Sequence, residues 1–245
     1  TSERQGGSLL GDVEAPTAHV ADYDMVRKMR AGILCLGPLL ARYGEARVSL
    51  PGGCAIGSRP IDLHIETMRR LGADISSEGG YVVARAQRLV GDRILFEKVT
   101  VGGTENALMA ASLARGTTVI ENAAKEPEVV DLANYLIAMG ARIEGVGSSV
   151  ITVEGVDELT PARHSIVPDR IEAGTLLIAG AITGGHVTVD CCVPEHLKSL
   201  ITKMRDAGFR VDTSDEAITV QSTDSWRAVD IATAPYPGFP TDLQA

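Results

Sequence analysis

The 245-residue sequence has few aromatic residues and no long apolar run, and each shortage excludes a class of protein. Phe, Trp and Tyr make up only 4% of the chain, so a core must consist mainly of Ala, Val, Ile and Leu. The longest nearly apolar run, residues 31–41, contains glycine and proline and is far shorter than the roughly 20 residues that span a bilayer. Basic residues are outnumbered by acidic ones, and the net charge of −9 argues against a general binder of nucleic acid or of membrane surfaces.

Cysteine is also scarce, and the 4 cysteines show neither the spacing of a metal site nor that of a disulfide framework. Cys35 lies within an apolar stretch, and adjacent Cys191 and Cys192 in a Val-rich stretch are interpreted as strand residues. This pattern favours reduced thiols and a cytoplasmic location.

Cys54 differs from the other cysteines because it lies in a glycine-rich loop. Residues 51–60 read Pro-Gly-Gly-Cys-Ala-Ile-Gly-Ser-Arg-Pro. Glycines allow such a loop to close over a ligand, and the Arg59 guanidinium would favour the thiolate form of Cys54. The alternative is a turn between a strand and a helix in which Cys54 only fills a small site. The loop by itself leaves both interpretations open.

A pattern about seventy residues long occurs three times in the chain. Each copy is a helix-like segment that ends in glycine, followed by two alternating strands, and Gly72, Gly140 and Gly208 are 68 positions apart. Glycine just past a helix is a common terminator. A further glycine signal precedes another strand in each copy. The sequence therefore predicts an α/β fold built from repeated helix–strand–helix–hairpin units.

The repeat also distinguishes the Cys54 loop from the equivalent links in the other copies. Those links, near Asn122 and Cys192, lack the Gly-Gly-Cys-x-x-Gly pattern. A purely structural turn would not require such a specialised copy, so the comparison favours a lid over a candidate active site.

Six ordered segments resemble the enolpyruvyl transferase family, and within it the UDP-N-acetylglucosamine 1-carboxyvinyltransferases. They are residues 23–31, 51–60, 60–64, 121–128, 167–172 and 239–245. The resemblance implies inside-out α/β barrel domains of repeated β-α-β-α-β-β units, incomplete at both ends of this chain. It places a cysteine-loop domain at residues 1–167 and the beginning of a second, similar domain at 168–245.

The resemblance also implies a reaction. The enolpyruvyl group of phosphoenolpyruvate is transferred to the 3-hydroxyl of UDP-N-acetylglucosamine, and phosphate is released. This is the first committed step of bacterial peptidoglycan synthesis and the target of fosfomycin. No cofactor is expected, since addition and elimination need no metal in principle. Neither a nucleic acid nor a membrane partner is expected, and the oligomeric state is left open.

Site residues follow from the matched motifs. Asp242 is expected to be the base for the sugar hydroxyl, although a helix-opening acid looks the same in sequence. Cys54 is expected to act as general acid or in product release, and to be alkylated by fosfomycin. Arg59 would bind phosphate oxygens, and Arg30 would lie near the cysteine loop. Solvated surface arginines are the alternative for both.

The nucleotide sugar is expected to bind at two helix starts. The residues concerned are Pro60, Ile61, Asp62 and Leu63 in one segment, and Lys98, Thr100, Val101 and Gly102 in the other. Free N–H groups at a helix start form an anion site. The second helix is predicted to begin near Glu105 with Thr104 as a possible N-cap, an alternative compatible with binding.

Other acids have a structural interpretation. Glu126, Glu128 and Asp131 are interpreted as acids that stabilise a helix start rather than as catalytic groups. Asp169, Arg170 and Glu172 could form an interdomain ion-pair cluster or part of the ligand cleft, and the sequence leaves both open.

Two rival functions are considered. One is 5-enolpyruvylshikimate-3-phosphate synthase, against which the Cys54 loop and residues 60–63 argue. The other is a non-catalytic binding module of the same fold, which the presence of both Cys54 and Asp242 disfavours. The family uses further residues near its two termini, so the isolated 245-residue chain is expected to be inactive.

Overall fold

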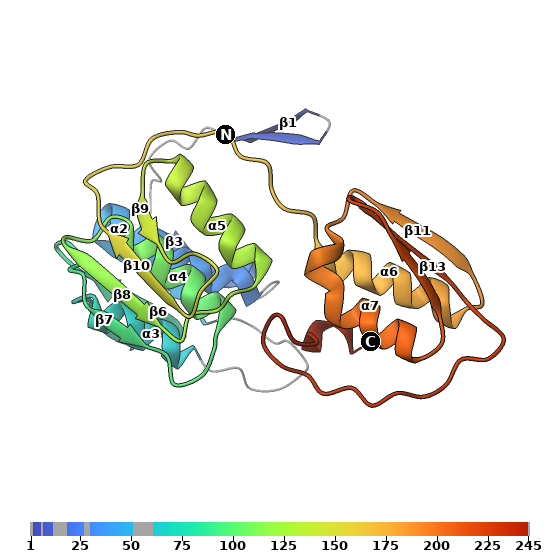
Figure 1. The fold of residues 1–245 in the computed structure, drawn as a ribbon. Helices are drawn as coiled ribbons and strands as arrows, with labels where there is room; N and C mark the ends of the chain where they lie inside the picture. The colour runs from blue at the N-terminus through green and yellow to red at the C-terminus, as the bar shows by residue number, and fades with distance from the viewer. Residues whose placement is uncertain (1, 6, 12–18, 27–29, 51–60, 245) are drawn as a thin grey trace. The chain divides into compact units, whose positions relative to one another are not determined.

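The computed structural model describes residues 2–5, 7–11, 19–26, 30–50 and 61–244, which form helices and small sheets (Figure 1). The chain divides into two compact units. The first comprises Thr1–Ile94, Glu105–Val119 and Val153–Leu159, and the second comprises Leu95–Thr104, Ile120–Thr152 and Thr160–Ala245. Among the described helices, none combines the length and the apolar character that crossing a membrane requires.

The first repeat forms a four-stranded sheet with helices between its strands. Its elements are β3 (Val20–Ala21), α1 (Tyr23–Val26), η1 (Arg30–Cys35), α2 (Leu36–Tyr43), β4 (Glu45–Ser49), α3 (Asp62–Arg70), β5 (Asp74–Glu78) and β6 (Tyr81–Arg85). The strand order is β3-β4-β6-β5. Strand β3 is parallel to β4, and β6 pairs antiparallel with both β4 and β5, so that Val83 lies opposite Arg47 and Ser76.

The second repeat follows the same order, and the third follows it without an opening strand among the described residues. The second consists of β7 (Arg93–Leu95), α4 (Val101–Ala111), β8 (Thr117–Glu121), α5 (Pro127–Ala138), β9 (Arg142–Glu144) and β10 (Val150–Glu154). The third consists of α6 (Arg170–Ile182), β11 (His186–Asp190), η2 (Pro194–Leu197), α7 (Lys198–Asp206), β12 (Arg210–Thr213) and β13 (Ala217–Gln221). The sheets are ordered β7-β8-β10-β9 and β11-β13-β12.

In every repeat the second strand of the hairpin lies in the middle. On one side it pairs with the first strand of the hairpin, and on the other with the strand that comes before the hairpin in the chain. The predicted α/β fold of repeated units is therefore confirmed. A separate hairpin of β1 (Ser2–Gln5) and β2 (Ser8–Gly11) is antiparallel.

The predicted helix terminators adopt the conformation for which glycine is suited. Gly72, Gly140 and Gly208 follow α3, α5 and α7 and have φ angles of +91°, +103° and +98°. A side chain would strain the backbone in this left-handed region. The repeat spacing read from the sequence is therefore a spacing of helix ends.

The core of the third repeat is aliphatic, as the shortage of aromatic residues predicts. Helices α6 and α7 pack on one face of the sheet β11-β13-β12 (Figure 1). Leu177 of α6 and Ile218 of β13 are fully buried, and Leu200 of α7 joins the same cluster. Burial of one such side chain contributes about 1.5–3 kcal/mol. Phe239 and Leu243 also belong to this cluster, so the chain segment around residue 242 is fixed to the core.

Two residues other than glycine adopt positive φ in the described part of the chain, and both follow the same strand of a repeat. Asn122 follows β8 with φ +55°, and Cys191 follows β11 with φ +54°. The prediction that Cys191 and Cys192 are strand residues is wrong, because β11 ends at Asp190. Cys192 is buried in the core, and burial raises the pKa of its thiol.

We expect Cys191→Asn to raise the free energy of unfolding by about 0.5–1 kcal/mol, because Asn tolerates the left-handed conformation better than Cys. The exposed position leaves room for the amide. Urea unfolding followed by the fluorescence of Trp226, the single tryptophan, measures the change. Cys191→Val should lower stability, since a β-branched residue is least tolerated there. Equal stability of the two variants would contradict the prediction.

Candidate active site

Helix α4 begins at Val101, before the predicted start near Glu105. Thr100 is its N-cap, since the Oγ1 atom accepts a hydrogen bond from Gly103 N–H at 3.2 Å. A Cβ atom at Gly103 would lie 2.4 Å from Thr100 Cγ2, so glycine is required there. Gly102 and Gly103 each disfavour a helix by about 1 kcal/mol, which explains the wrong prediction, and the cap offsets part of that cost.

Thr104 is buried and links two segments by hydrogen bonds; it is not the N-cap of α4. Its hydroxyl donates to the Thr100 carbonyl at 2.7 Å and accepts from Ala124 N–H at 3.0 Å. The interpretation of Thr104 as an N-cap is therefore wrong. Its hydrogen bonds link the first turn of α4 to the segment that follows β8.

The start of α4 combines a cation with backbone donors. Lys98 is exposed, and no described residue forms an ion pair with it. The first N–H groups of the helix, those of Val101 and Gly102, have no intrahelical acceptor. A lysine and free N–H groups at the positive end of a helix favour phosphate. Lys98, Thr100, Val101 and Gly102 therefore lie at one helix start, and their binding of an anion stays a prediction.

The second predicted helix start is α3. Asp62 and Leu63 form its first turn after Ile61, and Asp62 is exposed. The Leu63 carbonyl accepts a hydrogen bond from Thr67 Oγ1 at 2.7 Å. His64 follows on the same turn and is only 4% exposed. The first turn of α3 therefore exposes the Asp62 carboxylate to solvent and buries the His64 ring.

His64 takes part in a buried hydrogen-bond network around Asn106 of α4. Asn106 Oδ1 accepts from Gly37 N–H at 2.7 Å. Its Nδ2 atom lies 3.3 Å from the Ile33 carbonyl oxygen and 3.1 Å from His64 Nδ1. Asn106 is fully buried and ties η1, α2 and α3 to α4. Sequence reasoning missed this residue; the available signal was an amide next to the apolar Ala107 and Leu108.

Asp242 lies in the short helix η3 (Thr241–Leu243). Its side chain is exposed, and it has no partner among the described residues. The neighbouring Phe239 and Leu243 are buried, and Ser199 Oγ donates to the Gly238 carbonyl at 3.2 Å. The backbone around Asp242 is therefore anchored, while its exposed carboxylate contacts no other described side chain.

The acids at the start of α5 have specific partners. Glu126 precedes the helix and is 6% exposed, and its carboxylate accepts from Lys125 N–H at 2.9 Å and from Tyr236 N–H at 3.2 Å. Asp131 Oδ1 accepts from Val167 N–H at 3.2 Å and lies 2.9 Å from His164 Nε2. These contacts agree with a structural rather than a catalytic role for both acids. The hydrogen bonds to residues distant in sequence were not predicted.

Glu128 also makes a long-range contact, a bidentate ion pair with Arg170. Arg170 Nη2 and Nε lie 2.9 and 3.2 Å from the two carboxylate oxygens, and the Arg170 side chain is 8% exposed. Asp169 caps α6 by accepting from the N–H groups of Ile171 and Glu172 at 2.8 and 3.1 Å. For Arg170 the structure therefore supports the ion-pair interpretation.

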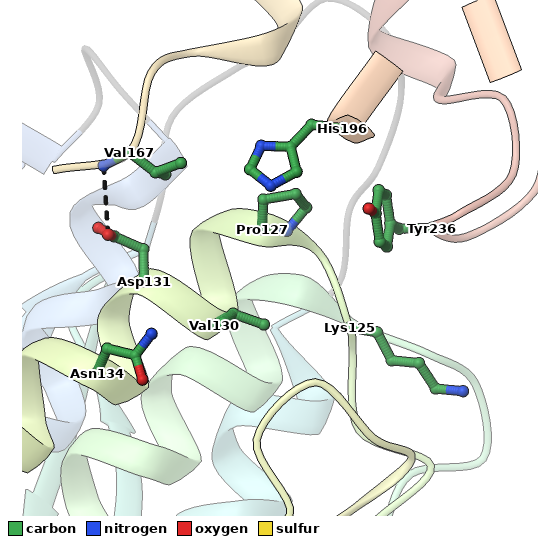
Figure 2. A pocket seen from close by; sticks show the side chains of 8 residues that line it. All are labelled: Lys125, Pro127, Val130, Asp131, Asn134, Val167, His196 and Tyr236. Carbon is green, nitrogen blue, oxygen red and sulfur yellow. Dashed lines mark hydrogen bonds between the residues drawn. The ribbon is translucent and has the colours of Figure 1, made fainter. Parts of the chain in front are cut away.

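A pocket of about 250 Å³ lies at the start of α5 (Figure 2). It is lined by Lys125, Pro127, Val130, Asp131, Asn134, Val167, His196 and Tyr236. The His196 ring lies beside Pro127, and burial, together with the Arg170 charge, lowers the pKa of His196 (Figure 2). None of the predicted site residues that the structure describes lines this pocket. It is therefore distinct from the two helix starts and from Asp242.

Several predicted site residues lie outside what the structure describes. Cys54, Arg59 and Pro60 fall in residues 51–60, and the side chain of Arg30 is likewise outside the description. Their grouping with Asp242 and with the helix starts stays a prediction.

Two relatives with similar sequences carry the same name. The chain is 66% identical over 233 residues to the UDP-N-acetylglucosamine 1-carboxyvinyltransferase of Bdellovibrio bacteriovorus, covering 95% of the chain and 56% of the relative. It is 57% identical over 226 residues to the protein of that name from Thermodesulfovibrio yellowstonii, covering 92% and 54%. The chain spans about half the length of the curated relatives it matches.

Solved structures with the same fold are more distant in sequence. The enolpyruvyl transferase NikO from Streptomyces tendae superposes with a TM-score of 0.80 at 22% identity, covering 99% of this chain and 59% of that one. An EPSP synthase from Acinetobacter baumannii gives a TM-score of 0.56 at 17% identity, covering 84% and 48%. These likenesses confirm the fold class.

The family model of EPSP synthase (3-phosphoshikimate 1-carboxyvinyltransferase) matches residues 4–245. The relatives and this match agree with the motifs that run along the chain from the Cys54 loop to Asp242. Together they confirm the resemblance seen in the sequence: the chain belongs to the EPSP synthase family of enolpyruvyl transferases.

Proposed function

We propose that the protein containing this chain transfers the enolpyruvyl group of phosphoenolpyruvate to the 3-hydroxyl of UDP-N-acetylglucosamine and releases phosphate. The observation that supports this most strongly is the 54–66% identity to relatives that bear the name UDP-N-acetylglucosamine 1-carboxyvinyltransferase. The start of α4 agrees with it, because a lysine and backbone N–H groups there suit a diphosphate.

The proposed reaction has two stages. In the addition, Asp242 takes the proton of the sugar hydroxyl, the oxygen bonds to the enol carbon, and Cys54 or another acid protonates the methylene carbon. In the elimination, the carbon–oxygen bond to phosphate breaks, a methyl proton leaves, and the double bond is restored. Arg59 and Arg30 would balance the charge of the phosphate oxygens.

The exposed, unpaired carboxylate of Asp242 suits the role of a base, since no described cation competes for it. The diphosphate of the nucleotide would lie against Lys98 and the N–H groups of Val101 and Gly102. Asp62 would contribute hydrogen-bond acceptors from the α3 start. No cofactor enters either stage.

We also propose that residues 1–167 form the cysteine-loop domain and residues 168–245 the beginning of a second domain. The cap of α6 at Asp169, which opens the third repeat, supports this boundary. A bacterial cytoplasmic location is proposed as well, on the basis of Cys35, Cys191 and Cys192, which are free thiols.

Phosphate release by the intact protein tests the function. With phosphoenolpyruvate present, we expect release with UDP-N-acetylglucosamine and none with shikimate 3-phosphate. Fosfomycin should then form a single adduct, on Cys54, when the sugar nucleotide is present. Release with shikimate 3-phosphate alone would identify the sister synthase instead. Binding of the sugar nucleotide without any release would indicate a non-catalytic module.

A further inference from the structure

The side-chain amide of Asn106 has two backbone partners whose polarity is fixed. The Gly37 N–H group can only donate, so the atom that faces it at 2.7 Å must be the amide oxygen. The Ile33 carbonyl can only accept, so the atom that faces it at 3.3 Å must be the amide nitrogen. The backbone thus determines which way round the amide lies.

This orientation has a consequence for His64. The Asn106 nitrogen, a donor, lies 3.1 Å from His64 Nδ1. A nitrogen that accepts a hydrogen bond must present a lone pair, so the ring proton of His64 is on Nε2 and the ring is neutral. The His64 side chain is also buried, at 4% exposure.

Asn106 lies so close to α2 that the hydrogen-bond network leaves no room for a side chain at Gly37. A Cβ atom at Gly37 would lie 2.3 Å from Asn106 Oδ1 and 2.7 Å from the Asn106 carbonyl oxygen. Only glycine at position 37 leaves room for the amide. Asn106 is itself fully buried, so neither its oxygen nor its nitrogen can exchange these partners for bulk water.

We propose that Asn106 is a positioning residue that holds His64 as the neutral Nε2–H tautomer and thereby fixes the first turn of α3 for the sugar nucleotide. The second half of this statement rests on the proposed function. His64 directly follows Asp62 and Leu63 on that turn. A ring locked at one nitrogen cannot rotate or take up a proton without breaking the bond to Asn106, so the turn is kept in one arrangement.

Nitrogen NMR of the histidine rings tests the tautomer in the intact protein. We expect His64 Nδ1 to show the signal of an unprotonated nitrogen and Nε2 that of a protonated one. Asn106→Asp should reverse this, because a carboxylate needs a donor from Nδ1. The control is Gln87→Glu, the same amide-to-acid change at an exposed site in the same unit, which should leave the His64 signals unchanged. A protonated Nδ1 in the wild type would overturn the proposal even if Asn106→Asp fails to fold.

Steady-state kinetics test the positioning role. Asn106→Asp should raise the KM for UDP-N-acetylglucosamine about tenfold and change kcat by no more than about twofold, since the interaction helps to bind the ground state. An unchanged KM after a reversed tautomer would overturn the role. If the wild type binds no UDP-N-acetylglucosamine yet shows the Nε2–H tautomer, the proposed function and the positioning role both fall, while the tautomer assignment stands.

Discussion

Asp242→Asn should lower kcat for phosphate release about 10²–10⁴-fold, the range expected when a general base is removed. The amide has nearly the same shape but cannot accept the hydroxyl proton. The carboxylate is exposed and has no described partner, while Phe239 and Leu243 anchor the segment, so the fold should be unaffected. Initial rates with saturating phosphoenolpyruvate and UDP-N-acetylglucosamine measure the effect.

The matched control for Asp242 is Asp224→Asn. Asp224 is an exposed aspartate in the same unit and also has no described partner. Its replacement changes the net charge equally and should leave kcat unchanged. Full activity of Asp242→Asn would remove Asp242 from the mechanism. An equal loss in both variants would point to a general effect of charge.

The largest expected effect on stability concerns Glu128. Glu128→Gln should lower the free energy of unfolding by about 2–3 kcal/mol, because it leaves the charge of the nearly buried Arg170 without its counter-ion. The Arg170 side chain is 8% exposed and that of Glu128 is 43% exposed, so solvent screening reduces the effect below that of a fully buried pair. Urea unfolding followed by Trp226 fluorescence reports on the unit that contains both residues.

An exposed ion pair provides the control for Glu128. Glu66 lies 3.2 Å from Arg70 on α3, and both side chains are more than half exposed, at 59% and 58%. Glu66→Gln should change the free energy of unfolding by less than about 0.5 kcal/mol. Equal effects of the two substitutions would show that burial of Arg170 adds nothing to the pair.

The repeat could be predicted because its signals are local. Gly72, Gly140 and Gly208 end helices for a reason that involves only their own backbone conformation, and that reason is visible in a single sequence. Alternation of apolar residues likewise predicted the hairpins. The α/β class therefore followed from periodicity and glycine spacing before any contact was known.

The start of α4 could not be predicted in the same way. Intrinsic propensity disfavours a helix at Gly102 and Gly103, and the sequence pointed to Glu105. The cap by Thr100 is local and offsets only part of that cost. The hydrogen bond from Ala124 N–H to Thr104 Oγ1 at 3.0 Å joins residues 20 positions apart and also holds the first turn in place. Propensity scales contain no information on such a tertiary contact.

The buried side-chain hydrogen bonds were not predicted because their partners are distant in sequence. Asn106 is separated from His64, Gly37 and Ile33 by 42, 69 and 73 positions. Glu126 and Tyr236 are 110 positions apart. Any of these polar residues could equally have faced solvent, and only the packing of helices shows which of them do not.

The sequence by itself determined the repeated α/β architecture, the family, and the residue types proposed for catalysis and phosphate binding. Motifs and periodicity depend only on the order of residues along the chain, so they can be recognised without a structure. The tertiary structure alone decided that α4 begins at Val101, that Arg170 pairs with Glu128 and that Asn106 faces His64. These arrangements depend on burial and on the fixed polarity of backbone groups brought close by folding. A linear sequence specifies such partners only through the fold it adopts.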